Sequence, residues 1–167
     1  MAILASEIKE YRSTFTASSV DSLGGAITAT EIVDNTTHNI WDVVSSAESL
    51  AGDTEYRCIY VKNTNSSLTL QSAKVWIATN TPSTDTSVEI GLGTSAVGGT
   101  EQTVANENTA PSGVTFSTAA GEGNALSIGN IPNGSYKAIW IKRIVGAAAG
   151  AYNDDNYVLS YAGDTAA

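Results

Sequence analysis

Several residue types that define common protein classes are scarce in this chain. Its 167 residues include one cysteine, Cys58, so no disulfide can form within the chain, and one histidine, His38. A zinc site needs several such ligands, so none is expected here. Cys58 lies inside an apolar run, which is typical of a buried, inert thiol rather than of a nucleophile.

Basic residues are also few. Eight lysines and arginines stand against 17 acidic residues, for a net charge of −9, and the only adjacent basic pair is Lys142 and Arg143. A protein that binds nucleic acid needs clustered cations to displace counterions from phosphates, so we expect no nucleic-acid partner. The acidity favours solubility, and the alternative is electrostatic matching with a basic partner surface.

Long hydrophobic runs are missing as well. No apolar run approaches the length of a membrane-spanning helix, so no membrane partner is expected. Residues 1–7 lack the cationic and apolar segments of a secretory signal. We therefore expect the protein to be made and folded in a cytoplasm.

The groups that usually carry out catalysis are absent or isolated. His38 lies in a polar stretch, and no Gly-x-Ser-x-Gly motif presents a nucleophile, so a solvated loop histidine is expected. Residues 91–96 loosely fit a dinucleotide-binding fingerprint, but the glycine pair at 98–99 breaks the helix that must follow. Residues 153–156 offer oxygen ligands without the spacing of a calcium loop. The sequence therefore predicts no catalytic residues, no cofactor and no metal site.

Two kinds of ligand-binding residue are present but scattered. The carboxylates lie in several loops, so no pair can be assigned the separation that a glycosidase needs. They are Asp53, Glu55, Asp85, Glu89, Glu101 and Glu107. Aromatic side chains could line a sugar-binding face, but most lie in expected strands, where packing is the commoner role. They are Tyr11, Tyr56, Tyr60, Tyr136, Tyr152, Tyr157, Tyr161, Trp41, Trp76 and Trp140.

What the chain does contain is Thr, Ser, Asn and Gly around short β-branched and aromatic runs. About eight such runs, with no amphipathic helix between them, predict an all-β protein. The expected architecture is an antiparallel two-sheet β-sandwich, Ig-like or jelly-roll, over residues 26–167. The expected strands are 26–33, 56–62, 68–70, 73–78, 87–92, 114–117, 125–128, 135–145 and 157–161, with 39–44 a short strand or helical turn.

Four local patterns refine this prediction. Residues 56–62 are apolar on both faces at their centre, as in a central strand. Residues 45–48 favour a single helical turn. Tyr136 follows a Pro-x-Gly turn, which indicates the start of a tyrosine corner. The long polar loop from Gly93 to Thr109 is the best candidate for an exposed binding loop.

Residues 1–25 differ from the rest of the chain. Their hydrophobic alternation is loose, residues 14–22 are rich in Thr, Ser and Ala, and a glycine pair follows at 24–25. Such a segment has too little apolar surface to form its own core. We expect an N-terminal arm that orders on a neighbouring subunit, with a floppy terminus as the alternative.

Four stretches together span nearly the whole chain. They are Ala-Ser-Glu-Ile-Lys at 5–9 with Ser-Leu-Gly-Gly-Ala at 22–26; the run at 51–63; Val-Trp-Ile at 75–77 with Thr-Pro-Ser at 81–83; and the run at 138–143 with Ala-Gly-Asp-Thr at 162–165. This combination resembles a group of small virion proteins of tailed bacteriophages.

The resemblance implies a non-enzymatic structural protein of the virion. The expected role is a capsid decoration (cement) protein, with a collar, neck or tail-associated protein as the alternative. The implied partners are the major capsid protein, or connector or tail proteins, together with further copies of the chain in a symmetric oligomer. A carbohydrate- or receptor-binding module is the alternative from a different class. No catalytic or binding residue is carried over from the family.

Overall fold

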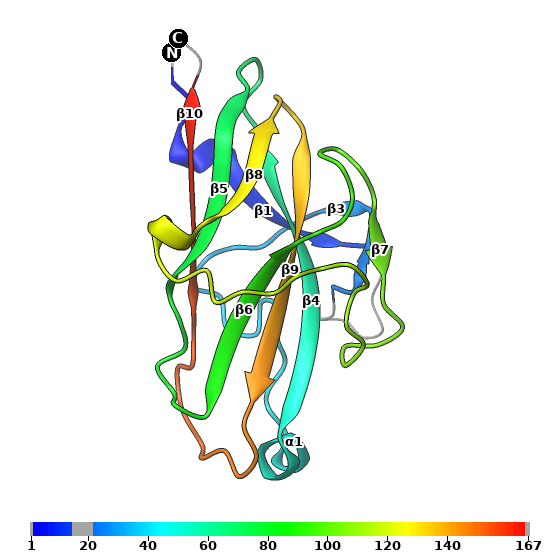
Figure 1. The fold of residues 1–167 in the computed structure, drawn as a ribbon, viewed down its shortest axis with the longest axis vertical. Coiled ribbons are helices and arrows are strands. Elements are labelled where there is room, and N and C mark those ends of the chain that lie inside the picture. Colours follow the sequence, from blue (N-terminus) through cyan, green and yellow to red (C-terminus); the bar gives the residue numbers. More distant parts are fainter. Residues whose placement is uncertain (1, 15–21, 166–167) are drawn as a thin grey trace.

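The computed structural model describes residues 2–14 and 22–165 and consists mostly of β-strands (Figure 1). Its helical segments are short: η1 (Ala5–Glu7), α1 (Ser46–Ala51) and η2 (Glu122–Asn124). The strands are β1 (Ile8–Ser13), β2 (Gly24–Gly25), β3 (Ile27–Glu31), β4 (Asp53–Asn63), β5 (Leu70–Thr79), β6 (Thr86–Leu92), β7 (Glu101–Thr103), β8 (Leu126–Ile131), β9 (Tyr136–Val145) and β10 (Val158–Thr165).

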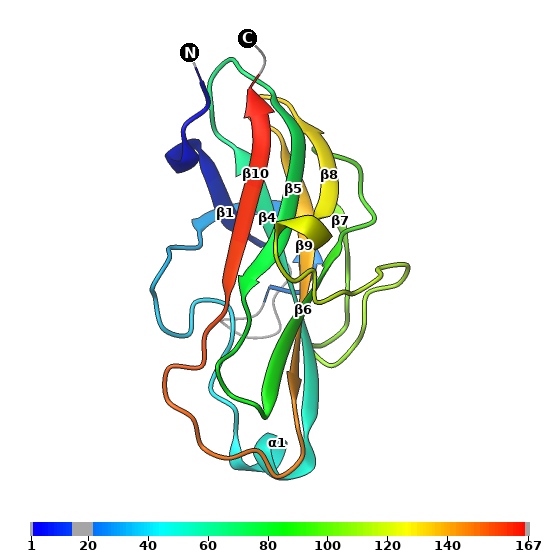
Figure 2. The ribbon, with the colours of Figure 1, turned by 60° about the vertical axis from the view of Figure 1, so that its left-hand side comes forward.

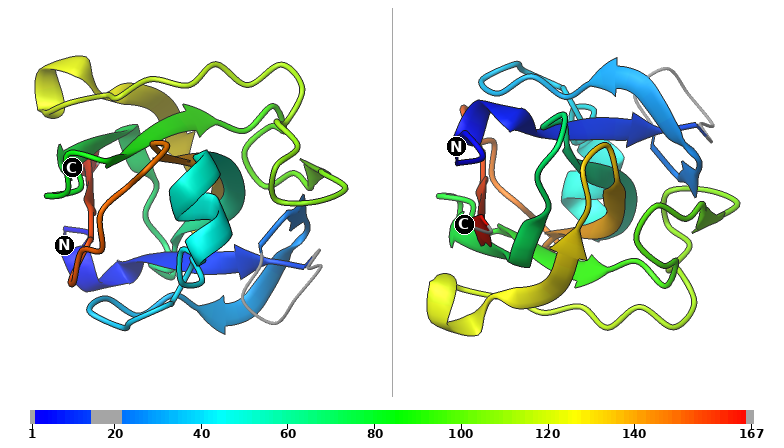
Figure 3. Two further views of the ribbon diagram at one scale, coloured as in Figure 1. Left: turned by 90° about the horizontal axis from the view of Figure 1, so that it is seen from below. Right: turned by 90° about the horizontal axis from the view of Figure 1, so that it is seen from above.

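The strands form antiparallel sheets, as the sequence predicts. The largest sheet has five strands in the order β3-β1-β4-β9-β6, the next has the order β10-β5-β8, and β2 pairs with β7. The longest ladder of the five-stranded sheet joins β4 to β9, from Asp53 opposite Val145 to Lys62 opposite Tyr136. Viewed along the long axis, β10 and β5 lie on one side of the molecule and the β2–β7 pair on the other (Figure 3).

The middle of β4 is buried on both of its faces, which confirms the expected central strand. Ile59 and Val61 belong to a first core cluster, whose members also come from β5, including Val75 and Ile77. Cys58 and Tyr60 point to the opposite face and belong to a second cluster with Trp140 and Leu23. β9 continues this alternation, and because neither face meets water, both strands read as nearly unbroken apolar runs.

The N-terminal segment does not form the expected arm. β1 lies inside the five-stranded sheet, between β3 and β4, and pairs with β4 from Ile8 opposite Asn63 to Arg12 opposite Ile59. Ser13 and Ser22 are each 1% exposed, and the Ser22 hydroxyl accepts a hydrogen bond from the Ser13 amide at 2.8 Å. Hydrogen bonds to the backbone allow these serines to be buried, so the polar sequence conceals an internal strand of the sheet. Residues 1 and 15–21 of the expected arm lie outside the described residues.

Smaller predictions have mixed outcomes. The expected helical turn is α1, and the Ser45 and Glu48 side chains each accept the other's backbone N–H in a capping box. Residues 39–44 form neither a strand nor a helix in the structure; instead Ile40 and Trp41 pack on the first core cluster. Residues 114–117 contribute only one bridge, between Ser117 and Ile90 of β6.

Candidate functional site: two buried carboxylate clusters

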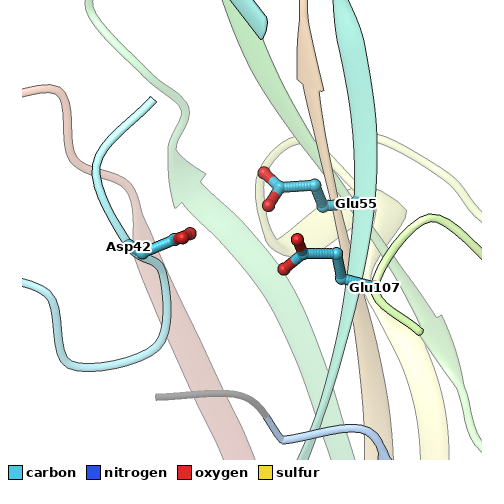
Figure 4. Close-up of side chains that lie close together, drawn as sticks. All are labelled: Asp42, Glu55 and Glu107. Carbon is cyan, nitrogen blue, oxygen red and sulfur yellow. The ribbon is translucent and has the colours of Figure 1, made fainter. Parts of the chain in front are cut away.

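Three carboxylates from distant parts of the chain point toward one another near the α1 end of the molecule (Figure 4). Asp42 lies in the loop before α1, Glu55 is on β4, and Glu107 follows β7. One oxygen from each carboxylate lies within 4.8 Å of the others. This convergence of acidic groups is the first candidate for chemistry in the structure.

Two arginines lie among these three carboxylates. Nη2 of Arg57 is 2.6 Å from Glu107 Oε2, 3.6 Å from Glu55 Oε1 and 3.7 Å from Asp42 Oδ1. Arg143, which faces Glu55 across the β4–β9 ladder, contacts the Glu55 carboxylate and is 3.6 Å from Asp42 Oδ1. The five side chains therefore form one network of alternating charge, which we call the Glu55 cluster.

Trp41 fastens this network to the loop before α1. The guanidinium carbons of Arg57 and Arg143 each lie 4.8 Å from the centroid of the Trp41 ring. Arg57 Nε also donates to the Ile40 carbonyl at 3.2 Å, and Arg143 Nη1 donates to the Asp42 carbonyl at 3.0 Å. Cation–π contacts and charge-assisted hydrogen bonds thus hold the loop against β4 and β9.

Glu55 is the most perturbed member of the cluster. Its side chain is 1% exposed, and burial raises its pKa to about 7 against the opposing charges of Arg143 and Arg57. Among the described residues, no donor makes a hydrogen bond to its Oε1 atom. A carboxylate held in low dielectric with one oxygen unsatisfied binds a proton more readily than one in water.

This geometry is a poor fit to metal binding or catalysis. Three carboxylates are a suitable donor set for a hard divalent cation, but the Arg57 guanidinium already lies between them. A pKa near 7 suits general acid–base chemistry, which requires the proton to reach a substrate atom directly or through one water. Glu55 is too deeply buried for that contact. The cluster therefore acts on the fold, by joining the loop to the sheet.

A second buried carboxylate, Glu101, begins β7 inside the loop from Gly93 to Thr109 and is 3% exposed. Burial alone would raise its pKa, but hydrogen bonds donated by the Ser95 amide at 2.9 Å and the Thr94 hydroxyl at 3.0 Å lower that pKa to about 2. We call these three residues the Glu101 cluster.

Further contacts tie this loop to the sheet. Lys137 donates to the Gly93 carbonyl at 2.8 Å, and the Glu101 amide donates to the Tyr60 hydroxyl at 3.0 Å. Gly24 in β2 has φ +94°, and a Cβ there would lie 1.9 Å from the carbonyl oxygen of Gln102. The loop is therefore packed against β2 over residues 101–104, rather than exposed throughout as the sequence suggested.

The other candidate residues are dispersed. His38 is exposed in the loop that follows β3, with a left-handed φ of 55°. Cys58 is fully buried, and burial raises the pKa of its thiol well above the usual range. In the stretch 91–96, a Cβ on Gly91 would lie 2.5 Å from Val114, so this glycine serves close packing. Asp155 accepts hydrogen bonds from Thr86 and Ser83 and so ties its loop to the β5–β6 connection.

The remaining carboxylates and the aromatic residues also have identifiable partners. Glu89 pairs with Lys142 at 2.9 Å, and Asp85 accepts from the Gly150 amide at 2.9 Å. Tyr60, rather than the expected Tyr136, donates its hydroxyl to a distant backbone carbonyl, that of Gly25; the Tyr136 ring packs edge-on against it. Tyr152 is different, because its side chain is 54% exposed.

Glu55 and Glu107 are recognisable in the sequence as candidate carboxylates, but the residues that define their environment are not. Arg57, Arg143 and Asp42 were missed. The available signal was Arg57 itself, because a charged residue between Tyr56 and Cys58 in a central strand requires a buried counter-charge.

Comparison with known proteins gives no assignment: no family model, no curated protein and no solved structure matches the chain. Within the described residues, no helix is both long and apolar enough to cross a membrane.

Proposed function

We propose that the chain is a non-enzymatic structural protein of a tailed-phage virion, with capsid decoration as its role. In this proposal it folds as a two-sheet β-sandwich, associates with further copies of itself, and stabilises the particle through lateral contacts. A collar, neck or tail position is the alternative within the same class. The sequence resemblance motivates the virion setting, and the structure supports an assembly role as follows.

Two features support the sandwich. The first core cluster takes side chains from both larger sheets, among them Ile139 of β9 and Val75 of β5. Residues 117–121 are hydrogen-bonded to both sheets, since Ser117 exchanges two hydrogen bonds with Ile90 and Gly121 donates to Ile77 at 3.1 Å. A shared core and a bridging segment are what two stacked sheets require.

The observation that carries the assembly role is a set of exposed apolar side chains in and near α1. Val43, just before α1, is 66% exposed, Leu50 in α1 is 75% exposed, and Tyr152 follows at 54%. α1 is joined to the loop before Tyr152, since the Ser49 hydroxyl donates to the Ala149 carbonyl at 2.7 Å (Figure 1). Large exposed apolar side chains on neighbouring segments favour burial against a partner protein, which supports an assembly role.

The test is incorporation into particles. Wild-type protein should co-sediment with capsids built from the major capsid protein of the same phage, and Val43→Asp with Leu50→Asp should abolish this. Leu4→Asp, at a residue 62% exposed outside the α1 end, is the matched control and should retain incorporation. Absence of the chain from purified virions, or full incorporation of the double variant, would contradict the proposal.

Tyr152 also gives the carbohydrate-binding alternative one specific observation. An exposed aromatic ring followed by Asn153 and Asp154 combines an apolar face with polar groups, as sugar-binding platforms do. Saturable binding on a glycan array that is lost in Tyr152→Ala would favour this alternative, and an array without binding would exclude it.

A further inference from the structure

The edges of the two larger sheets approach each other on two sides of the molecule. Chain covers the space between the edges more fully on one side than on the other. On one side, residues 117–121 are hydrogen-bonded to β6 and to β5 and so cover the opening. On the other side, β10 lies beside β1 with a groove of about 420 Å³ between them (Figure 2). The groove is lined by residues 5, 6, 8–10 and 31–34 on one wall and by Leu159 and Tyr161 of β10 on the other. We call it the β10 groove.

β10 presents an open strand edge to this groove. Among the described strands it pairs with β5 alone, and its regular register runs from Leu159 opposite Ile77 to Ala162 opposite Lys74. On the other side, the contacts among described residues are made by side chains: the Ile3 amide donates to the Thr165 hydroxyl at 3.1 Å, and Tyr161 donates to Glu10. An unpaired strand edge is a template for an added strand.

The chemistry of the groove is apolar at its base and acidic at its rim. Ile8, Ile32 and Leu159 contribute to the first core cluster, while Glu10, Glu31 and Asp34 supply carboxylates. Lys9, the one cation in the lining, is 2.8 Å from Glu31.

Glu10 and Asp34 therefore remain without a cationic partner within residues 2–14 and 22–165. Burial raises the pKa of Glu10, the Tyr161 hydroxyl opposes that rise, and the charge of Asp34 adds to it. A cation entering the groove would relieve this repulsion.

We propose that the β10 groove binds a short, extended, lysine- or arginine-rich segment of a partner protein, which pairs with β10 as the fourth strand of its sheet. Backbone hydrogen bonds to β10 would supply affinity, and the carboxylates at the rim would select basic side chains at alternate positions. A second copy of this chain is a poor occupant, because its net charge is −9 and its eight basic residues are scattered. The inference rests on the proposed assembly role only for the identity of the partner.

The test uses the full chain and a short fluorescent peptide that alternates lysine and valine, followed by fluorescence anisotropy. One control peptide has glutamate in place of lysine, and another is N-methylated at alternate residues so that it cannot pair with a strand. Only the unmodified basic peptide should bind, and binding should slow amide exchange of residues 158–165. Added salt should weaken it.

Protein variants test the acidic rim. Glu10→Gln with Asp34→Asn should weaken peptide binding about five- to tenfold, as expected for two partly exposed charge contacts. Asp154→Asn with Glu122→Gln removes the same two charges at exposed residues outside the groove and should leave binding unchanged.

Four outcomes would overturn the proposal: equal binding of the glutamate peptide, equal binding of the N-methylated peptide, equal protection of β10 by lysine amide alone, or dimerisation through β10 without any peptide. Peptide binding is measured on the isolated protein. Failure of the wild-type protein to bind the basic peptide therefore refutes the groove proposal and leaves the virion proposal unaffected. Absence of the chain from purified virions refutes the virion proposal and leaves the groove proposal unaffected.

Discussion

Glu55 and Glu101 are both buried glutamates, at 1% and 3% exposure, yet their pKa values are displaced in opposite directions. Glu101 accepts hydrogen bonds from the Thr94 hydroxyl and the Ser95 amide, one at each oxygen. Glu55 faces two guanidinium groups, but its Oε1 has no hydrogen bond among the described residues. Burial raises one pKa to about 7, whereas hydrogen bonds lower the other to about 2.

The difference shows that satisfied lone pairs matter more than the mere presence of opposite charge. A hydrogen-bond donor at each carboxylate oxygen replaces the water that the oxygen loses on burial. A guanidinium shared among three carboxylates, as Arg57 is, cannot do so for each of them. The Glu101 cluster therefore holds its loop with a carboxylate that stays ionised near neutral pH. The Glu55 cluster holds its loop with a carboxyl group that changes protonation near pH 7.

The largest effect is expected from removing the central cation of the Glu55 cluster. Arg57→Met should lower the free energy of unfolding by about 3–5 kcal/mol, because it leaves buried carboxylates without their partner. Urea denaturation measures the change, and Lys62→Met on the same strand is the control. Adding Glu55→Gln to Arg57→Met should recover part of the loss; a loss below about 1 kcal/mol would show that the network is not cooperative.

The next largest effect is the dependence of stability on pH. It should have an upper limb between pH 7 and 4.5, caused by Glu55, and a lower limb between pH 4.5 and 2, caused by Glu101. The pKa of Glu55 is raised from 4.5 to about 7 in the folded protein, so its contribution to stability grows as pH falls through 7 toward 4.5. The pKa of Glu101 is lowered from 4.5 to about 2, so its contribution is complete above 4.5 and is lost as pH falls toward 2. Thermal unfolding across this range should flatten the upper limb in Glu55→Gln and the lower limb in Glu101→Gln. Loss of the lower limb in Glu55→Gln and of the upper limb in Glu101→Gln would contradict these pKa directions.

Replacing each carboxylate by its amide compares the clusters directly. Glu101→Gln should lower the free energy of unfolding by about 1–3 kcal/mol near neutral pH, because an amide cannot accept both hydrogen bonds equally well. Glu55→Gln should cost less, since its folded-state carboxyl is already partly protonated near pH 7. Chemical denaturation of both variants at one pH gives the ranking, and equal losses would remove the distinction between the clusters.

The smallest effect is expected at the rim of the Glu55 cluster. Asp42 has half of its side chain exposed, and its carboxylate lies 3.6 Å or more from both guanidinium groups. Asp42→Asn should change the free energy of unfolding by no more than about 1 kcal/mol, because water screens such pairs. A larger loss in urea denaturation would mean that Asp42 shares the buried character of Glu55.

The central strands could be predicted from the sequence because their pattern is local. The runs at 56–62 and 135–145 became β4 and β9, and the helical turn expected from residues 45–48 is α1. β1 was missed, because its alternation is weak and its burial depends on Ser13 and Ser22, which are satisfied by distant backbone groups. Polar residues of this kind are recognisable as core only once their partners are known.

The candidate site was less predictable than the fold. Glu55 and Glu107 were visible as acidic residues, but they are 52 residues apart in the sequence. Strand pairing and loop packing bring their carboxylates together. Arg57 and Arg143 face the same cluster only because β4 and β9 are in their observed register. A shift of one residue would place these side chains on the other face of the sheet.

By itself, the sequence determined the β-rich character, the central pair of strands, the single helical turn and the net negative charge, because propensity, alternation and composition do not depend on distant contacts. Only the tertiary structure decided that residues 8–13 form an internal strand of the sheet, that one buried glutamate binds its proton weakly and another strongly, and that β10 keeps an edge without a paired strand among the described residues. Each of these depends on which distant groups come within hydrogen-bonding or Coulombic range, and chain folding sets those distances.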